Sequence, residues 1–187
     1  GTKLFKGFVQ RSIVKDSTHQ FACSEKAGNS MFGNEKGHKK YRILKNAIEV
    51  EQFRYSPETR ARIRKNMGVA NEKVIITVGN LVAVKNHTFL IDAFRIALKE
   101  ENGIRLWIVG GGKLKETLQT QIDLWHLSGQ EILLGARNDV DELLQAADLY
   151  VCTSFSEGVS LSGVEAQTSG LRGLASDGIS REHRITD

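Results

Sequence analysis

The stretch "KVIITVGNLVAVKNHTFLIDAFRIALKEENGIRLWIVGGG", from Lys73 to Gly112, predicts one strand–helix–strand unit. Its first and last segments, 73–79 and 105–112, are apolar, contain Val and Ile residues and end in glycine, as buried strands do. The segment 87–100 between them carries apolar side chains along one helical face, at Leu90, Ala93, Phe94, Ala97 and Leu98. Because neither strand alternates apolar and polar residues, both faces of the sheet are expected to be covered, which is typical of parallel strands.

The same cycle continues as far as residue 177. Further strands are predicted at 131–135, 148–154 and 171–177, and further helices at 113–127, 138–147 and 160–170. Strands that alternate with helices are typical of an α/β fold with a doubly wound, Rossmann-like parallel sheet. Before residue 72 the periodicity is weaker. Short strands are predicted there at 19–24 and 41–48, and a helix is predicted to begin at Ser56 and Pro57.

The composition limits the class of protein. The chain has 187 residues, of which 40% are hydrophobic, and a net charge of +4, which fits one globular domain or a domain with a fragment of another. This small net charge does not require a nucleic-acid partner. The basic residues gather in two groups, interpreted as solvated helix faces, with a membrane surface or an anionic ligand as the alternative: Lys39, Lys40, Arg42 and Arg60, Arg62, Arg64, Lys65.

The two cysteines, Cys23 and Cys152, lie in apolar surroundings without a CxxC partner, and both are predicted to be buried free thiols of a reducing compartment. The sequence shows no signal peptide and no apolar run of the roughly 18 residues that a membrane span needs. It begins at Gly1 rather than Met and is therefore expected to be a piece of a longer protein.

Ligands of such sheets bind outside the carboxyl ends of the strands. Glycines let backbone amides approach a ligand there, helix starts suit phosphate, and Lys85 would add a positive charge. The glycines at 110–112 do not form GxGxxG, and a tight strand-to-helix turn is the alternative for them. The segments predicted at this edge are Gly79 to Lys85, Gly110 to Lys113, Gly135 to Asp139, Ser154 to Ser160, and Asp177 onward.

Residues 153–171, "TSFSEGVSLSGVEAQTSGL", hold two glutamates, Glu157 and Glu165, separated by seven residues. Two interpretations of Glu165 stay open from the spacing. It is a ligand group, or it closes a capping box with Ser162 and contacts no ligand. Glu157 and Lys85, taken singly, fit ordinary solvated surface residues equally well.

Four ordered blocks resemble a known family: "VGNLVAVKNHTFLIDAF", "LWIVGGGKLKETL", "ILLGARNDVDELLQAADLYVCTSFSEGVSLSGVEAQTSGL" and "ASDGISREHRIT". They are similar to the C-terminal, donor-binding half of a retaining GT-B glycosyltransferase of family 4, close to bacterial capsular and exopolysaccharide enzymes. The glutamate pair matches that family's E-x7-E motif. The resemblance implies a Rossmann-like nucleotide-sugar domain over 71–187, truncated at its C-terminus, and a tail of the acceptor domain plus linker over 1–70.

The resemblance also implies roles for single residues. Gly79 and Lys85 would contact the donor diphosphate, Glu157 would be catalytic and face the transferred sugar, and Glu165 would bind the ribose hydroxyls. Residues near the base and around the start of the last helix complete the set of donor-binding residues: Gly79, Asn80, Lys85, Gly110, Arg137, Asn138, Val140, Ser156, Gly158, Val159, Ser160, Leu161 and Glu165. No metal and no cofactor are implied, since lysine and helix dipoles neutralise the phosphates.

The chain departs from the family pattern in three places. Asn80 replaces an arginine, Thr153 replaces a proline, and Leu171–Gly173 replaces the usual GLP. The loss of the arginine removes one charge from the expected phosphate site.

The implied function is the nucleotide-sugar-binding part of a retaining hexosyltransferase that extends a polysaccharide or a glycolipid. A UDP-sugar is the expected donor, and a saccharide or lipid-linked acceptor would bind through the N-terminal domain. The chain alone is expected to be inactive, and the protein to be cytoplasmic or peripheral on the inner face of the membrane, with no nucleic-acid partner. A non-catalytic nucleotide-sugar or interaction module and a nucleotide-sugar epimerase are the alternatives. The E-x7-E spacing and the Lys85 loop favour the transferase over the epimerase.

Overall fold

The computed structural model describes residues 7, 9, 12–33, 41–130 and 132–180. Predictions that concern Lys39, Lys40, residue 131 and the end of the last family block, 181–186, lie outside the described residues.

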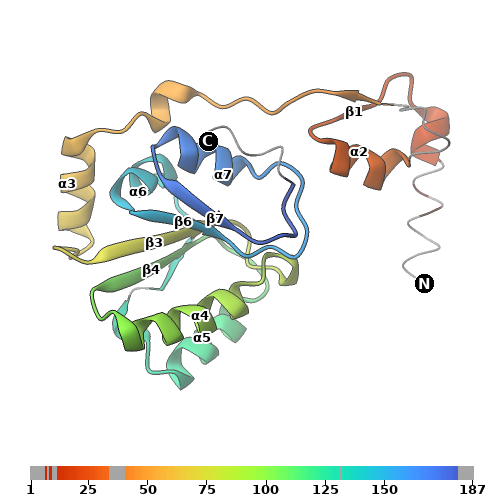
Figure 1. Ribbon diagram of the computed structural model, residues 1–187. Coiled ribbons are helices and arrows are strands. Elements are labelled where there is room, and N and C mark those ends of the chain that lie inside the picture. The colour runs from red at the N-terminus through yellow and green to blue at the C-terminus, as the bar shows by residue number, and fades with distance from the viewer. Residues whose placement is uncertain (1–6, 8, 10–11, 34–40, 131, 181–187) are drawn as a thin grey trace.

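One parallel sheet of five strands forms the centre of the molecule (Figure 1). The strand order is β5-β4-β3-β6-β7. The chain thus runs outward from β3 to β5, crosses back, and continues from β6 to β7 on the other side, which is the doubly wound topology predicted from the sequence. The strands are β3 (Lys73–Val78), β4 (Ile104–Val109), β5 (Leu133–Gly135), β6 (Leu149–Cys152) and β7 (Arg172–Ala175).

Helices cover both faces of this sheet (Figure 1). On one face lie α4 (His87–Glu100) and α5 (Lys115–Leu124). On the other lie α3 (Pro57–Asn66), α6 (Val140–Ala146) and α7 (Leu161–Thr168). The described residues also include short 3-10 helices, η2 (Val50–Phe53), η3 (Ala83–Lys85) and η4 (Ser128–Gln130).

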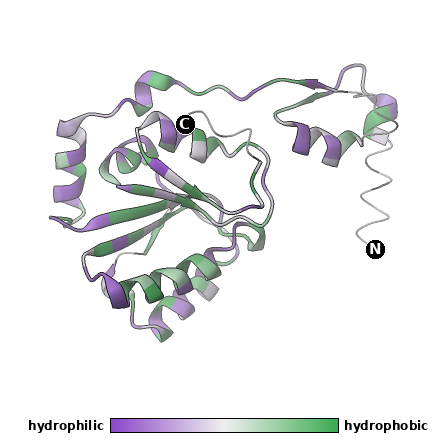
Figure 2. Ribbon diagram, in the orientation of Figure 1, coloured by the Kyte–Doolittle hydropathy of each residue, from purple (hydrophilic) through white to green (hydrophobic). Residues whose placement is uncertain are grey.

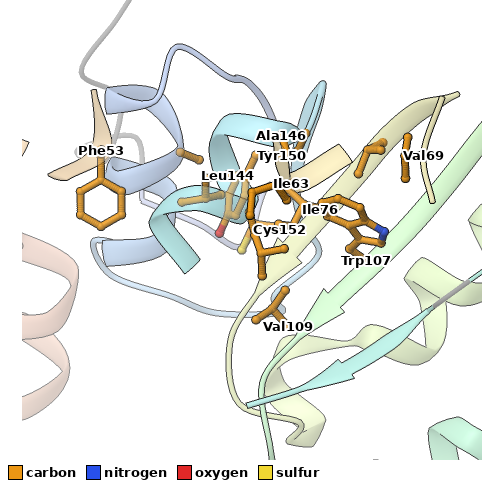
Figure 3. Close-up of a cluster of buried hydrophobic side chains, with 14 of the residues drawn as sticks. Phe53, Ile63, Val69, Ile76, Trp107, Val109, Leu144, Ala146, Tyr150 and Cys152 are labelled. Carbon is orange, nitrogen blue, oxygen red and sulfur yellow. The ribbon is translucent and has the colours of Figure 1, made fainter. Parts of the chain in front are cut away.

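Successive strand residues supply two separate cores, one on each face. Ile76 and Trp107 point to the α3–α6–α7 face, where Figure 3 shows them with Leu144. Leu106 and Ile108 point to the α4–α5 face. All five side chains are completely buried. Helices on both faces account for the mostly apolar residues of β3, β4 and β6, which are green over much of their length in Figure 2. The edge strand β7 is exposed, which corrects the expectation that all strands are covered.

The helix α3 begins where the sequence predicts. Ser56 caps α3, because its hydroxyl accepts a hydrogen bond from the backbone N–H of Thr59, and Pro57 occupies the first helical position. Trp125 differs from the prediction that it continues the buried face of α5. It ends the helix with 42% of its surface exposed, and its ring lies 4.0 Å from the Arg95 guanidinium carbon.

Two members of the basic group on α3, Arg60 and Arg64, are not solvated, which corrects the interpretation made from the sequence for them, whereas Arg62 and Lys65 are exposed. Arg60 and Arg64 are mostly buried, and their guanidiniums bind the Asp148 carboxylate at 2.7 Å and 3.2 Å. Arg62 pairs with Glu142 of α6 at 2.8 Å. Arg60 and Arg64 therefore attach α3 to the loop between α6 and β6, and Arg62 attaches it to α6.

The N-terminal part is a separate small unit. β1 (Phe21–Ala22) and β2 (Arg42–Ile43) pair in parallel, and α2 (Glu25–Phe32) packs beside them. Both strands are shorter than predicted, because after Ile43 the chain leaves the pair and runs as an extended segment to η2 (Figure 1). Cys152 is buried as predicted, whereas Cys23, at the end of β1, is only half-buried, which corrects the prediction for that residue.

Among the described residues, no helix has both the length and the apolar character that crossing a bilayer requires.

Candidate functional site

Two glycine turns pack backbone against backbone at the carboxyl ends of β3 and β4. The N–H of Gly79 donates to the carbonyl of Val109 at 2.9 Å. Gly110 has a φ of +147°, and a Cβ there would lie 2.0 Å from the carbonyl oxygen of Gly79. Gly112 meets the Leu81 backbone in the same way, at 2.6 Å. These glycines are required for the close approach of the two loops, which is the tight-turn alternative considered for 110–112.

Lys85 extends from η3 across the end of β3. A Cβ on Gly79 would lie 3.4 Å from the Lys85 side-chain carbon Cε, so the lysine stem passes directly over that glycine. Its ammonium forms an ion pair with Glu157, at 2.7 Å between Nζ and Oε1. Residues 72 positions apart in the sequence therefore meet at this edge of the sheet.

The Glu157 carboxylate is anchored from several sides. Its second oxygen, Oε2, accepts a hydrogen bond from the Ser154 hydroxyl at 2.9 Å and one from the Cys152 thiol at 3.5 Å. Burial by itself raises the pKa of Glu157, but Lys85, Ser154 and Cys152 outweigh this effect and lower the pKa below its ordinary value. Glu157 is thus an ionised, mostly buried carboxylate and not a solvated turn residue.

Thr153 holds the Lys85 turn in place. Its hydroxyl lies 3.0 Å from the carbonyl oxygen of Lys85 and 3.2 Å from that of Asn86. The resemblance places a proline at this position, and a proline could not make either hydrogen bond. Thr153, directly after β6, therefore makes a contact with the turn at Lys85 and Asn86 that a proline would not make.

The start of α7 closes the other side of the site. Ser160 is the N-cap, and its hydroxyl accepts a hydrogen bond from the N–H of Gly163 at 3.3 Å. Ser162 lies inside the helix and donates to the carbonyl of Val78 at the tip of β3, at 3.0 Å. The start of α7, with its free backbone amides, therefore lies next to the tip of β3.

Glu165 does not form a capping box with Ser162, so that alternative is wrong. The N-cap of α7 is Ser160 and the helix begins at Leu161, which leaves Glu165 in the second turn. Burial and the neighbouring Asp141 of α6 raise the pKa of this carboxyl. Within the described part of the chain, its carboxylate has no hydrogen bond, so its acceptor capacity is available to a ligand.

The residues predicted to lie by the base form the loop before α6. Arg137 pairs bidentately with Asp139, at 2.8 Å and 2.6 Å. Asp139 is the N-cap residue of α6 but makes no side-chain cap, because its carboxylate is occupied by the arginine. Val140 is half-buried against the α6 core, and Asn138 is exposed.

His87 is a residue whose environment the sequence did not reveal. It is the first residue of α4, next to the Lys85 turn, and only 2% of its surface is exposed. Burial, with a smaller contribution from Lys85, lowers the pKa of its imidazole to about 4. Within the described residues its Nδ1 has no hydrogen-bond partner. The ring is therefore neutral near pH 7, and Lys85 carries the positive charge of this turn.

The structure brings together only part of the predicted set. Five members of the predicted set take part in the contacts described above: Gly79, Gly110, Lys85, Glu157 and Ser160. The remaining members line the turns around them: Asn80 and Leu161 are exposed, Ser156 is exposed beside Glu157, and Gly158 and Val159 are half-buried between Glu157 and α7. No group of three or more His, Cys, Asp or Glu side chains in the described ranges is placed to hold a metal ion.

The family model described as glycosyl transferases group 1 matches residues 59–185, more than half of the chain, so the protein belongs to this family. The chain is 31% identical over 177 residues to "Putative glycosyltransferase EpsF" of Bacillus subtilis, covering 92% of this chain and 46% of that protein. It is also 31% identical over 144 residues to the UDP-Gal:alpha-D-GlcNAc-diphosphoundecaprenol alpha-1,3-galactosyltransferase of Escherichia coli, covering 74% and 37%. The chain thus spans about half or less of the length of these curated relatives.

Solved structures share the fold. The Anabaena protein HepE, in complex with UDP and glucose, has a TM-score of 0.87 at 22% identity, covering 100% of this chain and 52% of that chain. WaaG, a glycosyltransferase involved in lipopolysaccharide biosynthesis, has a TM-score of 0.74 at 22% identity, covering 87% and 45%. These likenesses confirm one Rossmann-like half of a GT-B architecture. The family assignment does not favour the interaction-module or epimerase alternatives.

Proposed function

We propose that this chain is the donor-binding part of a retaining glycosyltransferase and that its donor is a UDP-sugar. The observation that carries the proposal is the cluster at the carboxyl end of the sheet. The Lys85 ammonium pairs there with the mostly buried Glu157 carboxylate, and the start of α7 is attached to the end of β3 by the hydrogen bond from Ser162 to Val78. Lysine and free helix amides together suit a diphosphate.

We place Glu157 and Glu165 at opposite ends of the proposed donor. The diphosphate would lie at the start of α7, next to Lys85. Glu157 precedes this helix start and would face the sugar, where an ionised carboxylate stabilises positive charge that develops at the anomeric carbon. Glu165 follows it and, near α6, would accept hydrogen bonds from the two ribose hydroxyls.

Lys85 can serve donor and carboxylate together, because an ammonium has three N–H donors and one suffices for Glu157. The diphosphate would therefore add to the ion pair rather than replace it. Lys85 and the helix amides supply the neutralisation that a divalent cation gives elsewhere, so binding without added metal is part of the proposal.

The names of related proteins support the transfer reaction and the acceptor class. The Escherichia coli relative is named for UDP-Gal as donor and for a diphosphoundecaprenol-linked acceptor, and another, from Streptococcus pneumoniae, is named alpha-monoglucosyldiacylglycerol synthase. An α product formed from an α-linked sugar nucleotide is retention of configuration. By analogy, the acceptor of this protein would be a saccharide or a lipid-linked saccharide. A lipid-linked acceptor would place the enzyme at the cytoplasmic surface of the membrane. The acceptor would bind to residues outside this chain.

Removal of the Lys85 ammonium is expected to weaken UDP binding by about 1–3 kcal/mol, or roughly 5- to 150-fold in Kd, since this is the range for hydrogen bonds to charged groups. Calorimetric titration of wild type and Lys85→Ala with UDP, GDP and their sugars, with and without EDTA, measures it. Lys99→Ala, at the exposed end of α4, is the matched control and should bind as wild type does. Equal affinities for Lys85→Ala and wild type, or strict dependence on magnesium, would contradict the proposal.

A further inference from the structure

The first turn of α2 lies directly against the loop that carries Glu157. Ser24, the N-cap of α2, is completely buried. A Cβ on Gly158 would lie 2.9 Å from the Ser24 hydroxyl oxygen and 3.6 Å from the Ala27 Cβ. Only glycine fits at the residue after Glu157 with α2 in this position. Figure 1 shows α2 beyond the carboxyl ends of the strands, on the side where these loops emerge.

A second contact comes from the same turn. The Lys26 ammonium donates a hydrogen bond to the carbonyl of Gly178. This carbonyl also accepts the backbone N–H of Glu157 at 3.2 Å. It belongs to a short parallel bridge between Glu157 and Ile179, which the N–H of Ser180 completes by donating to the Glu157 carbonyl at 3.1 Å.

The loop around Gly178 packs closely against the backbone of residues 154–155. A Cβ on Gly178 would lie 2.2 Å from the Phe155 carbonyl oxygen, so the two backbone segments are in close contact. The Gly178 carbonyl is therefore the common acceptor of a lysine on α2 and of the backbone of Glu157. The charge-assisted hydrogen bond from Lys26 therefore fixes the position of the carbonyl that the Glu157 N–H uses as its acceptor.

We propose that Lys26 is a positioning residue for Glu157: through the Gly178 carbonyl it holds the backbone of that glutamate and so couples the segment before the linker to the sugar side of the donor site. The inference rests on the proposed role of Glu157 in transfer. Lys26 and Gly178 are 152 positions apart, so the contact ties the N-terminal unit to the end of the sheet.

Hydrogen exchange of the full-length enzyme tests the structural half without depending on transfer. Lys26→Met removes the ammonium and keeps most of the stem, and the Glu157 amide should then exchange about tenfold faster, while amides of β3 and β4 stay unchanged. Lys45→Met, at an exposed lysine of the linker, is the control. Unchanged exchange at Glu157 would overturn the proposal.

Kinetics of the same proteins test the catalytic half. Lys26→Met should lower kcat about tenfold with UDP affinity within about twofold of wild type, because the ammonium contacts the Glu157 loop and not the nucleotide. Lys26→Arg keeps a cationic donor and should restore most of kcat and the slow exchange. An unchanged kcat in Lys26→Met, in an enzyme that transfers sugar, would overturn the positioning role. A wild-type enzyme that neither transfers sugar nor binds UDP would instead refute the proposed function, and the exchange result would still decide the Lys26 contact.

Discussion

Replacement of Asp148 by alanine is expected to lower the free energy of unfolding by about 3 kcal/mol, at the lower end of the range for breaking a buried charge pair. The Asp148 carboxylate accepts hydrogen bonds from Arg60, from Arg64 and from the backbone N–H of Val74, the last at 2.8 Å. It therefore joins α3 and β3 at the entrance to β6. The expected loss of stability stays near the lower end of that range because both arginines still donate to backbone carbonyls, Arg60 to that of Ala147 and Arg64 to that of Ala146.

Urea denaturation of the Asp148→Ala variant measures this loss. Asp139→Ala is the matched control, because its ion pair with Arg137 is more exposed, at 38% and 32% of the two side chains, and should cost about 1 kcal/mol or less. Equal losses in the two variants would contradict the assignment of Asp148 as the junction.

Acid should reproduce part of the Asp148 effect. Burial raises the pKa of this carboxyl, but the Val74 N–H, Arg60 and Arg64 outweigh it and hold the pKa below its ordinary value of 3.8. A lowered folded pKa means that the stabilisation is complete above 3.8 and disappears as the pH falls through the lower folded value. The difference in the free energy of unfolding between wild type and Asp148→Ala should therefore become smaller as the pH falls below 3.8.

In the full-length enzyme, Glu157→Gln is expected to lower kcat by about 10²- to 10³-fold, the effect of removing one preorganised electrostatic group. The side chain keeps its size, and its amide can still accept from Ser154, but the negative charge that we propose to lie beside the anomeric carbon is lost. UDP affinity should stay the same or increase slightly, because Lys85 is released from its ion pair with Glu157.

Steady-state kinetics and UDP titration of Glu157→Gln separate these two quantities. Ser154→Ala, which removes one hydrogen bond to the carboxylate and leaves the charge, should reduce kcat far less. A large loss of UDP affinity with kcat unchanged would place Glu157 at the nucleotide and contradict its proposed position at the sugar.

Much of the fold could be predicted because its signals are local. The apolar run 73–79 and the helical spacing from Leu90 to Leu98 need only neighbouring residues to be recognised, and both elements form where expected. The Asp148 junction was not predicted, since its arginines lie 84 and 88 positions away and resemble a solvated helix face in sequence. Trp125 was misplaced because helical periodicity does not show where a helix ends.

The candidate site also combines features that could be predicted from the sequence with features that could not. The rule that ligands bind at strand ends places Lys85 and Glu157 at one edge of the sheet, but it cannot show that they pair. Ser162 and Glu165 fit a capping box by spacing, yet the hydroxyl of Ser162 contacts β3, a neighbour that only the folded sheet supplies. The contacts of Thr153 depend in the same way on the turn at Asn86, which has a positive φ of 55°.

We propose that a nucleoside diphosphate binds between Glu157 and Glu165. The most direct test compares the Kd of UDP for wild type and Glu165→Gln by calorimetry, together with the melting temperatures of both proteins. We expect Glu165→Gln to weaken UDP about tenfold, because a weaker acceptor then faces the ribose, and to leave the melting temperature essentially unchanged. Glu116→Gln, an exposed glutamate on α5, should match wild type in both measurements. An unchanged Kd together with a lower melting temperature would show that Glu165 serves only the fold and would contradict the account.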